Sequence, residues 1–514
     1  MDTTPIPRLI AAAAARFAER PALVCEERRL TWGEFDARCR RLANALIDLG
    51  IGRGDNVLIL SRNSSAYVET YAGILRAGAC AAPLPSMATT EALRRMAEDS
   101  GAKAFFVSAE MRPLVEPFID ELTALAPGGR IAYDFAADGW AEYEDVLTAA
   151  SDADPEIVAD PSDPFNIIYS SGTTGVPKGI VHDHAMRSFQ HKRMESFGID
   201  ETAVTVLSTP LYSNTTLVAL IPTLVAGGCT VVMPKFDVVK FLQLCQHERV
   251  THTMLVPVQY QRIMAHPDFD SYDLGSMQVK WSTSAPLRVA VKRDVAARFP
   301  GKMAEVYSMT EGGPTTVLSV TEFPDKLDSV GRPGEGIIMK LIDDDGNEVA
   351  PGEIGEIIGH SGSMMIGYHN RPDLTDQITW RDAEGRMYIR SGDMGRFDED
   401  GFLYLSDRKK DMIISGGLNI YADDLERVLL GLDGVVDAAV IAIPSEAWGE
   451  TPLGLVVLAE GCEAKVEDLR DAANDALGKS QRLAAVEVRD SLPRSPIGKI
   501  LKRELRAPYW ENID

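Results

Sequence analysis

Short apolar runs alternate with longer amphipathic stretches from the N-terminus to about residue 330. Residues 56–60 and 104–107 are apolar runs of strand length, whereas residues 38–49 and 65–77 repeat apolar side chains at helical spacing. Strands that alternate with helices in this way predict βαβ units, which build parallel sheets covered by helices on both faces. The pattern therefore predicts an α/β fold for this part of the chain.

The pattern changes twice after about residue 330. Gly-Arg-Pro-Gly and Pro-Gly-Glu-Ile-Gly-Glu sequences separate short segments that are typical of a β-rich subdomain. Further along, residues 422–430 and 466–477 predict helices and residues 435–443 predict a strand, which together form a compact α+β unit. We expect a large N-terminal domain over residues 1–408 and a small C-terminal domain over residues 409–514.

Two apolar stretches resemble targeting or membrane segments. Residues 10–15 are apolar but too few for the core of a signal peptide, so we expect a first amphipathic helix there. Residues 209–234 carry no charge, yet a proline and two glycines interrupt them. They predict a buried helix followed by a strand over residues 229–233 rather than a membrane span.

Composition and charge limit the classes of partner. The chain has 514 residues, which at about 150 residues per domain predicts about three structural units. Its 45% hydrophobic and 25% charged residues are typical of a soluble globular protein. The net charge of -24 argues against nucleic acid or an anionic membrane as a partner, so any site for an anionic ligand must be made positive locally. Six scattered cysteines without CxxC spacing predict reduced thiols in a cytoplasmic protein rather than disulfides or a zinc site.

One loop combines hydroxyls, glycines and a lysine. Residues 169–179 read Tyr-Ser-Ser-Gly-Thr-Thr-Gly-Val-Pro-Lys-Gly and follow an apolar run, residues 165–169, that predicts a buried strand. Glycines let backbone amides approach an oxyanion, while hydroxyls donate hydrogen bonds and the lysine adds positive charge. The order of residues differs from a Walker A motif. The composition indicates a polyphosphate site at a strand end, and a flexible surface loop is the alternative.

This segment resembles the phosphate loop of the adenylate-forming superfamily, which comprises acyl-CoA synthetases, peptide-synthetase adenylation domains and luciferases. Four more segments resemble motifs of that superfamily and follow in its order. They are Tyr-Ser-Met-Thr-Glu-Gly at 307–312 for adenine and magnesium, Ser-Gly-Asp-Met-Gly at 391–395 for ribose, Asp-Arg-Lys-Lys-Asp at 407–411 for a hinge, and Ser-Pro-Ile-Gly-Lys-Ile at 495–500 for a C-terminal lysine. The resemblance covers nearly the whole chain.

The resemblance implies that ATP activates a carboxylic acid and assigns roles to individual residues. Lys178 binds phosphate, Thr310 contacts the α-phosphate and Glu311 holds Mg²⁺. Asp393 accepts hydrogen bonds from the ribose with Arg408 as a brace, and Lys499 bridges the carboxylate and the α-phosphate. The positions expected around ATP and AMP are Ser170, Ser171, Gly172, Thr173, Thr174, Gly175, Lys178, Ser284, Ala285, Glu305, Val306, Tyr307, Ser308, Thr310, Asp393, Arg408 and Lys499.

Each of these residues also has an ordinary structural interpretation. A lone Thr310-Glu311 pair is typical of a helix N-cap, and Asp393 followed later by an arginine is typical of a capped turn. The charged run at 407–411 is typical of a solvated turn, and Lys499 of a basic tail. The order of the motifs favours the catalytic interpretation.

A second set of positions is expected to bind the thiol and the acyl group. Gly416 and Gly417 resemble the segment that lines the pantetheine tunnel, and Lys235 resembles a lysine that meets the CoA nucleotide in coumarate ligases. Lys410 occupies the hinge position, about which the C-terminal domain of relatives rotates between half-reactions. The acyl pocket is expected at Tyr212, Ser213, Thr215 and Trp281.

The chain departs from the family pattern at two of these positions. Many relatives have His or an aromatic residue at the position of Ser213, so the smaller side chain opens the pocket to a bulky or long acid, or Tyr212 provides the gate instead. Some relatives have a lysine at the position of Gly416, so other cations are expected to bind the CoA phosphates.

We expect an AMP-forming acyl-CoA synthetase that uses ATP, Mg²⁺ and CoA on a hydrophobic, fatty or aromatic acid. The alternative is an adenylating ligase that loads the phosphopantetheine thiol of a carrier protein. A non-catalytic nucleotide-binding regulator is disfavoured because both Glu311 and Lys499 are present. The sequence predicts no nucleic-acid partner and no membrane span, and it leaves a homodimer open.

Overall fold

The computed structural model describes residues 4–156, 158–170, 177–408, 411–415, 418–420, 422–445, 448–462, 464–477, 482–495 and 498–510. Its contacts divide the chain into two compact units. The first unit contains Met1–Leu327, Gly334–Ile338 and His360–Ile389, and the second contains Asp328–Pro333, Met339–Gly359 and Arg390–Asp514. The boundary that we expect at residue 408 marks the start of a C-terminal domain that moves about a hinge. It stays a prediction.

The first unit contains a sheet whose central strands are parallel. Its order is β15-β14-β13-β12-β10-β11-β1-β2, and only the edge pairs β14–β15 and β1–β2 are antiparallel. The strands are β1 (Pro21–Cys25), β2 (Arg28–Thr31), β10 (Val204–Leu207), β11 (Cys229–Val232), β12 (His252–Leu255), β13 (Val279–Ser282), β14 (Lys302–Ser308) and β15 (Thr315–Ser319). The carboxyl ends of the parallel strands therefore meet at one edge.

A second sheet of the same unit has the order β19-β9-β8-β4-β3-β5-β6-β7. Strand β9 is antiparallel to both of its neighbours, and the other pairs are parallel. The strands are β3 (Asn56–Leu60), β4 (Cys80–Pro83), β5 (Ala104–Val107), β6 (Arg130–Ala132), β7 (Ala141–Glu142), β8 (Pro164–Ser170), β9 (Lys178–Asp183) and β19 (Gly367–Tyr368).

Helices cover both faces of the second sheet. Val57 and Ile59 of β3 face a core that contains α3 (Ser65–Arg76), whereas Leu58 and Leu60 face a separate core that contains α4 (Thr90–Ser100). This alternation follows from the two-residue period of a strand. The predicted parallel α/β architecture is confirmed.

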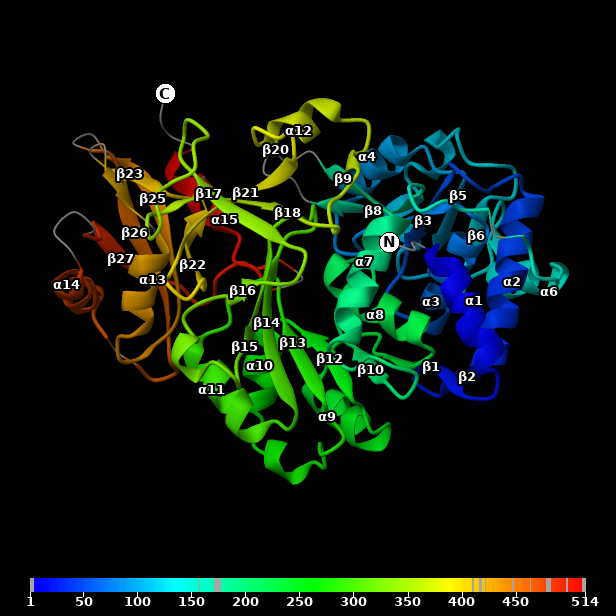
Figure 1. Ribbon diagram of the computed structural model, residues 1–514, viewed down its shortest axis with the longest axis horizontal. Helices are drawn as coiled ribbons and strands as arrows, with labels where there is room; N and C mark the ends of the chain where they lie inside the picture. Colours follow the sequence, from blue (N-terminus) through cyan, green and yellow to red (C-terminus); the bar gives the residue numbers. More distant parts are fainter. Residues whose placement is uncertain are drawn as a thin grey trace. The chain divides into compact units, whose positions relative to one another are not determined.

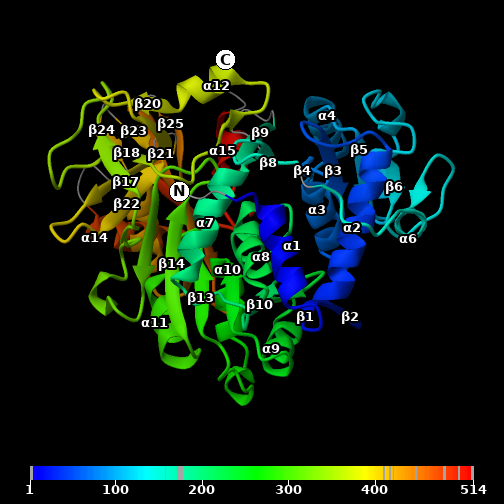
Figure 2. The same ribbon diagram turned by 45° about the vertical axis from the view of Figure 1, so that its right-hand side comes forward.

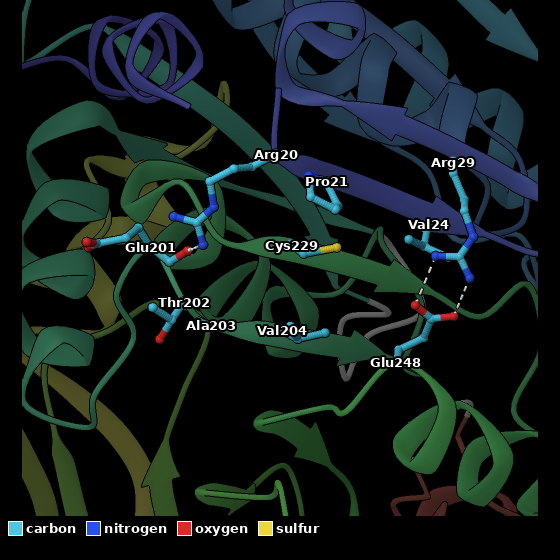
Figure 3. Close-up of a pocket in the computed structure, with 10 residues that line it drawn as sticks. All are labelled: Arg20, Pro21, Val24, Arg29, Glu201, Thr202, Ala203, Val204, Cys229 and Glu248. Carbon is cyan, nitrogen blue, oxygen red and sulfur yellow. Dashed lines mark hydrogen bonds and ion pairs between the residues drawn. The ribbon is translucent and has the colours of Figure 1, made fainter. Parts of the chain in front are cut away.

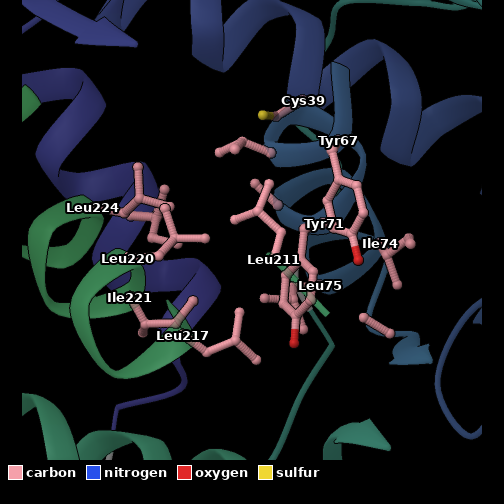
Figure 4. Close-up of a cluster of buried hydrophobic side chains, with 14 of the residues drawn as sticks. Cys39, Tyr67, Tyr71, Ile74, Leu75, Leu211, Leu217, Leu220, Ile221 and Leu224 are labelled. Carbon is pink, nitrogen blue, oxygen red and sulfur yellow. The ribbon is translucent and has the colours of Figure 1, made fainter. Parts of the chain in front are cut away.

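A layer of helices lies between the two sheets. It contains α1 (Ile6–Arg16), α2 (Trp32–Asp48), α3, α7 (His184–Glu195) and α8 (Asn214–Ala226), and Figures 1 and 2 show α1 beside α8 between the two sets of strands. In Figure 4 apolar side chains of α8 face Tyr67, Tyr71 and Leu75 of α3. The uncharged stretch predicted as a buried helix and a strand forms α8 and β11, and none of the described helices is both long and apolar enough to cross a membrane.

The remaining helices of the first unit connect its strands. They are α5 (Arg112–Val115), α6 (Tyr143–Ala149), α9 (Val238–His247), α10 (Pro257–Met264), α11 (Val289–Arg298) and α12 (Pro372–Gln377). Strand β20 (Thr379–Arg381) pairs with the first residues of β21 (Met387–Phe397).

The second unit contains most of a small sheet ordered β17-β18-β21-β22 and a separate α+β unit. The small sheet consists of β17 (Ile338–Ile342), β18 (Gly355–His360), β21 and β22 (Leu403–Arg408). The α+β unit has the strand order β24-β23-β26-β25, with β27 (Ala485–Val488) on β26. Its other elements are β23 (Ile413–Ser415), β24 (Leu418–Ile420), β25 (Val435–Ser445), β26 (Gly449–Leu458), α13 (Ala422–Leu430), α14 (Val466–Ala476) and α15 (Lys502–Trp510). The predicted α+β C-terminal unit is confirmed.

Candidate active site

The predicted phosphate loop joins two antiparallel strands of the second sheet. Strand β8 ends at Ser170 and β9 begins at Lys178, and these two residues pair across the ladder. The buried strand predicted before the loop is thus confirmed. Ser171, Gly172, Thr173, Thr174 and Gly175 lie outside the described residues.

Thr310 and Glu311 lie in a turn that follows β14. The N–H of Gly312 donates to the carbonyl of Met309 at 3.0 Å, and the chain continues into β15. No helix begins at this turn, so the interpretation of the pair as a helix N-cap is wrong. Both residues lie at the carboxyl edge of the first sheet, where α/β proteins bind their ligands.

A second segment of the chain approaches this turn so closely that only glycine fits at position 312. Its φ is 76°, and a Cβ atom there would lie 1.6 Å from the carbonyl oxygen of Ser363. The N–H of Met365 donates to the carbonyl of Glu311 at 2.9 Å. The turn is therefore held from outside by residues 363–365.

Glu311 and Lys178 converge on Tyr368. The hydroxyl of Tyr368 donates to Oε1 of Glu311 at 2.7 Å, and Nζ of Lys178 lies 5.3 Å from the centroid of the Tyr368 ring. Burial and the Glu311 carboxylate raise the pKa of Tyr368, so its hydroxyl keeps its proton at neutral pH. Two of the predicted catalytic residues thus share one neighbour.

His182 lies on β9, the strand that begins at Lys178, and it connects this strand to Thr310. Its Nε2 lies 2.8 Å from the carbonyl oxygen of Thr310, while Nδ1 lies 2.9 Å from an Arg187 nitrogen and 3.1 Å from Nδ2 of Asn166. Because both partners of Nδ1 are donors, Nδ1 accepts and Nε2 carries the proton. Desolvation and the charge of Arg187 lower the pKa of His182 well below its usual value, so the ring is neutral.

Tyr368, His182 and Arg187 were not predicted from the sequence. A signal was present for His182, because Lys178, Ile180 and His182 occupy alternate positions of β9 and therefore share one face. No comparable pattern marked Tyr368 or Arg187.

A buried ion pair holds together the two segments that are predicted to bind adenine, residues 284–285 and 305–308. Glu305 pairs with Lys292, and its Oε1 accepts the N–H of Leu287 at 2.9 Å. This contact fixes the segment after β13 that carries Ser284 and Ala285. Burial raises the pKa of Glu305. Val306, Tyr307 and Ser308 complete β14 beside it, and Ser308 Oγ lies 3.1 Å from Oγ1 of Thr315.

Residues 212–215, which carry three of the predicted acyl-pocket positions and are called the acyl segment below, contact Ser284 directly. Oγ1 of Thr215 lies 2.7 Å from Oγ of Ser284, which has a φ of 78°. A positive φ is uncommon for a residue with a Cβ atom, and it marks a constrained backbone position. Ser213 forms the N-cap of α8 and accepts the N–H of Thr215 at 3.3 Å.

The two aromatic residues of the predicted acyl pocket differ in their surroundings. Burial raises the pKa of Tyr212 to about 12, and its hydroxyl has no hydrogen-bond partner in the part of the chain that the structure describes. Trp281 is fully buried in β13, where its ring stacks on His252 with centroids 5.7 Å apart.

The other predicted site residues include an exposed lysine and residues of the second unit. Lys235 is exposed after β11. Asp393 pairs with Arg408 across β21 and β22, and its N–H donates to Oγ of Ser391 at 3.0 Å. The side chain of Arg408, and all of Lys410, Gly416 and Gly417, lie outside the described residues.

Lys499 lies in a closed turn of the second unit. The N–H of Ser495 donates to the carbonyl of Lys499 at 2.8 Å, and the N–H of Lys499 donates to Oγ of Ser495 at 3.1 Å. Arg494 anchors this turn through an ion pair with Asp437 at 2.6 Å and a hydrogen bond to the carbonyl of Gly498 at 2.7 Å.

A pocket of about 160 Å³ lies away from these motifs (Figure 3). It is lined by the first residues of β10 and β11, Val204 and Cys229, and by the ion pair of Arg29 with Glu248. It therefore opens at the amino edge of the parallel strands, opposite the edge that carries Thr310 and Glu311. We do not assign it to the active site.

The chain matches two family models in succession. Residues 10–369 match the AMP-binding enzyme model, and residues 424–499 match the model of the AMP-binding enzyme C-terminal domain. The chain belongs to the AMP-binding enzyme family. The predicted membership of the adenylate-forming superfamily is confirmed, and this AMP-binding enzyme is an AMP-forming ligase.

Relatives of this AMP-binding enzyme differ in their named acids and acceptors. It is 32% identical to the long-chain-fatty-acid–CoA ligase FadD13 of Mycobacterium tuberculosis, over 94% of each chain. It is 34% identical to a feruloyl-CoA synthase of an Amycolatopsis species, over 93% of this chain and 94% of that one. It is 31% identical to the fatty acid–[acyl-carrier-protein] ligase ScoC of Streptomyces coeruleorubidus, over 95% of this chain and 93% of that one.

A solved structure confirms the predicted fold of this AMP-binding enzyme. ATP-bound MatB from Rhodopseudomonas palustris superposes with a TM-score of 0.88 and 27% identity, covering 98% of this chain and 99% of that one.

Proposed function

We propose that this AMP-binding enzyme activates a hydrophobic carboxylic acid and transfers it to CoA. In the first half-reaction a carboxylate oxygen attacks the α-phosphorus of ATP, and the bond to pyrophosphate breaks. In the second, the thiol sulfur attacks the acyl carbon, the thiol proton is lost and AMP leaves. The observation that carries the proposal is the convergence of Lys178, Thr310 and Glu311 through Tyr368 and His182.

The convergence suits a nucleotide triphosphate. Lys178 supplies positive charge at one end of the phosphate loop, and the hydroxyl of Thr310 serves the α-phosphate. Glu311 is the carboxylate for Mg²⁺, which binds proteins through one or two carboxylates together with substrate phosphates and water. Among the described residues, no group of three or more His, Cys, Asp or Glu side chains is placed to hold a metal ion. The Tyr368 hydroxyl donates to Oε1 of Glu311, and a single oriented carboxylate fits that mode of binding.

The second unit supplies the remaining groups. Asp393 accepts hydrogen bonds from the ribose hydroxyls, with Arg408 as its partner on the neighbouring strand. Lys499 neutralises negative charge where the carboxylate of the acid meets the α-phosphate. Rotation about Lys410 then replaces Lys499 by Gly416 and Gly417, which admit the thiol arm, and Lys235 meets the CoA nucleotide. These roles rest on the motif matches, on the pairing of Asp393 with Arg408 across β21 and β22, and on the hydrogen bond between Lys499 and Ser495.

Two acceptors are supported by named relatives. FadD13 and feruloyl-CoA synthase are named for CoA, which favours CoA for this chain. ScoC is named for an acyl carrier protein, so a carrier thiol is the second candidate. The same names include both a fatty and an aromatic acid, and the proposed acid is accordingly hydrophobic rather than one defined compound.

Pyrophosphate release tests the proposal. Fatty and aromatic acids of graded size are supplied with ATP and Mg²⁺, with CoA, with a phosphopantetheinylated carrier protein, or with neither. We expect acid-dependent pyrophosphate release in every case and acyl-CoA only with CoA. Acyl-AMP that persists with CoA but is consumed by the carrier would contradict CoA as the acceptor.

A further inference from the structure

Arg187 is a buried cation without an ionic partner. Only 1% of its surface is exposed, and it lies on α7 with its guanidinium 5.5 Å from the ring of Phe165. No carboxylate within the described part of the chain forms an ion pair with it. Burial lowers the pKa of Arg187 to about 10, so it stays charged at neutral pH.

All five N–H groups of Arg187 are used by neutral acceptors. Nε and one terminal nitrogen donate to Oδ1 of Asn166 at 3.2 and 2.7 Å, and the same terminal nitrogen donates to Nδ1 of His182 at 2.9 Å. The other terminal nitrogen donates to Gln190 Oε1 and to Asn214 Oδ1, each at 2.8 Å. Because every N–H donor of this planar guanidinium group has an acceptor, the Arg187 side chain is held in one orientation.

The contacts of Arg187 form two branches toward the proposed site. One branch passes through His182 to the carbonyl of Thr310. The other reaches Asn214, the first residue of α8, whose neighbour Thr215 contacts Ser284. The first branch leads to the Thr310–Glu311 turn, and the second leads to the acyl segment.

We infer that Arg187 is a positioning residue that fixes the position of the acyl segment relative to the Thr310–Glu311 turn. This inference rests on the proposed function, in which the acid must approach the α-phosphate with correct geometry. A displacement of about 1 Å in such an arrangement costs on the order of 100-fold in rate. The positive charge of Arg187 also suits a chain of net charge -24 whose proposed adenylation step joins two anions, the acid and ATP.

Four variants test the two branches separately and together. Asn214→Ala removes only the acyl branch. His182→Asn keeps an acceptor for Arg187 near the Nδ1 position and removes the donor to Thr310. Arg187→Met removes both branches, and Arg187→Lys keeps the charge with fewer donors. Arg76→Met is the matched control, because Arg76 is also buried in the helix layer but pairs with Asp36 and Asp154.

Acid-dependent pyrophosphate–ATP exchange is measured with each full-length variant. We expect Asn214→Ala to raise KM for the acid about tenfold with KM for ATP unchanged, and His182→Asn to lower kcat about tenfold with KM for the acid unchanged. Arg187→Met should show both changes, with a loss of about 100-fold in kcat/KM, and Arg187→Lys should recover part of it. The double variant Arg187→Met/His182→Asn should lose less than the product of the single losses.

The inference is overturned if Asn214→Ala and His182→Asn change the same parameter or neither. It is also overturned if Arg76→Met loses as much activity as Arg187→Met at an equal loss of Tm, since the effect would then be general destabilisation. Absence of exchange by the unaltered enzyme with every acid would instead contradict the proposed function.

Discussion

At the scale of single residues, the proposed site depends on uncharged side chains that hold a carboxylate and a backbone turn in place. Tyr368 donates to Glu311, and neutral His182 donates to the backbone of Thr310. A carboxylate that accepts one fixed hydrogen bond has its other oxygen directed consistently toward a metal. In the proposed site, Tyr368 therefore fixes the direction in which Glu311 would face Mg²⁺.

Removing the hydroxyl of Tyr368 should weaken the use of Mg²⁺. In Tyr368→Phe the ring near Lys178 remains, while Glu311 loses the donor that orients it, so we expect about tenfold more Mg²⁺ for half-maximal pyrophosphate release. Titration of free Mg²⁺ at saturating ATP measures this. Tyr143→Phe is the control, because the buried Tyr143 hydroxyl donates to Glu69 at 3.0 Å in a structural cluster. Equal Mg²⁺ curves for Tyr368→Phe and the unaltered enzyme would contradict the assignment.

Sequence patterns predicted local features better than contacts between distant residues. The strand at residues 56–60 and the strand before the phosphate loop were predicted because their apolar side chains pack in a sheet that is covered on both faces. Tyr368 and Glu311 are 57 positions apart, and His182 and Thr310 are 128 positions apart. No local periodicity encodes such pairs. The motif matches selected Glu311 and Thr310 but not the side chains that hold them.

At the scale of elements, the turn after β14 depends on the segment that packs against it. Gly312→Ala adds a Cβ atom to a residue with φ of 76° and places it against the Ser363 carbonyl. The positive φ alone costs about 1–2 kcal/mol, and the clash must also displace the backbone of one segment. We expect adenylation to fall at least tenfold, measured as pyrophosphate–ATP exchange.

Gly50→Ala separates the conformational cost from the clash at Gly312. Gly50 has a φ of 74°, and a Cβ atom added there would meet no atom within 4 Å beyond its chain neighbours, so the change should lower stability without lowering exchange. If Gly312→Ala lost only stability, as Gly50→Ala does, the turn would not position the reaction.

The C-terminal α+β unit contains a carboxyl group that should respond to pH. Glu426 of α13 accepts the N–H of Val440 at 2.7 Å and pairs with Lys502 of α15 at 2.8 Å. Burial raises the pKa of Glu426 from 4.5 to about 7, against the opposing effect of Lys502. The folded state therefore binds the Glu426 proton more tightly than the unfolded state does.

The stability of this unit should fall as the pH rises from about 4.5 to 7. Ionisation over that range favours the unfolded state, where the carboxyl is solvated, and Glu426→Gln should remove this contribution. Hydrogen exchange of the α13 amides in the full chain, compared between Glu426→Gln and the unaltered protein, measures it. The difference should widen with pH, and a difference that is constant across the range would contradict the raised pKa.

At the scale of the whole molecule, the proposed residues belong to two units. Lys178, Thr310 and Glu311 belong to the first, whereas Asp393 and Lys499 belong to the second. Such a division suits a two-step reaction in which one unit presents different groups at each step. Neither unit contains all the residues to which the proposed mechanism assigns a role.

Lys499→Ala should separate the two half-reactions. If Lys499 acts only while the carboxylate meets the α-phosphate, its loss abolishes adenylation and leaves thioester formation from supplied acyl-adenylate intact. The two rates are measured separately, as pyrophosphate release from ATP and as acyl-CoA formation from synthetic acyl-AMP. Equal loss of both would contradict the alternation of the two units.

The fate of the carboxylate oxygens tests the central claim most directly. An acid that supports pyrophosphate release is labelled with ¹⁸O in its carboxyl group and converted with ATP, Mg²⁺ and CoA, and the nucleotide product is analysed by mass spectrometry. Attack of the carboxylate on the α-phosphorus predicts that AMP carries one labelled oxygen. Unlabelled AMP, or label in inorganic phosphate with ADP as the nucleotide, would contradict activation through an acyl-adenylate.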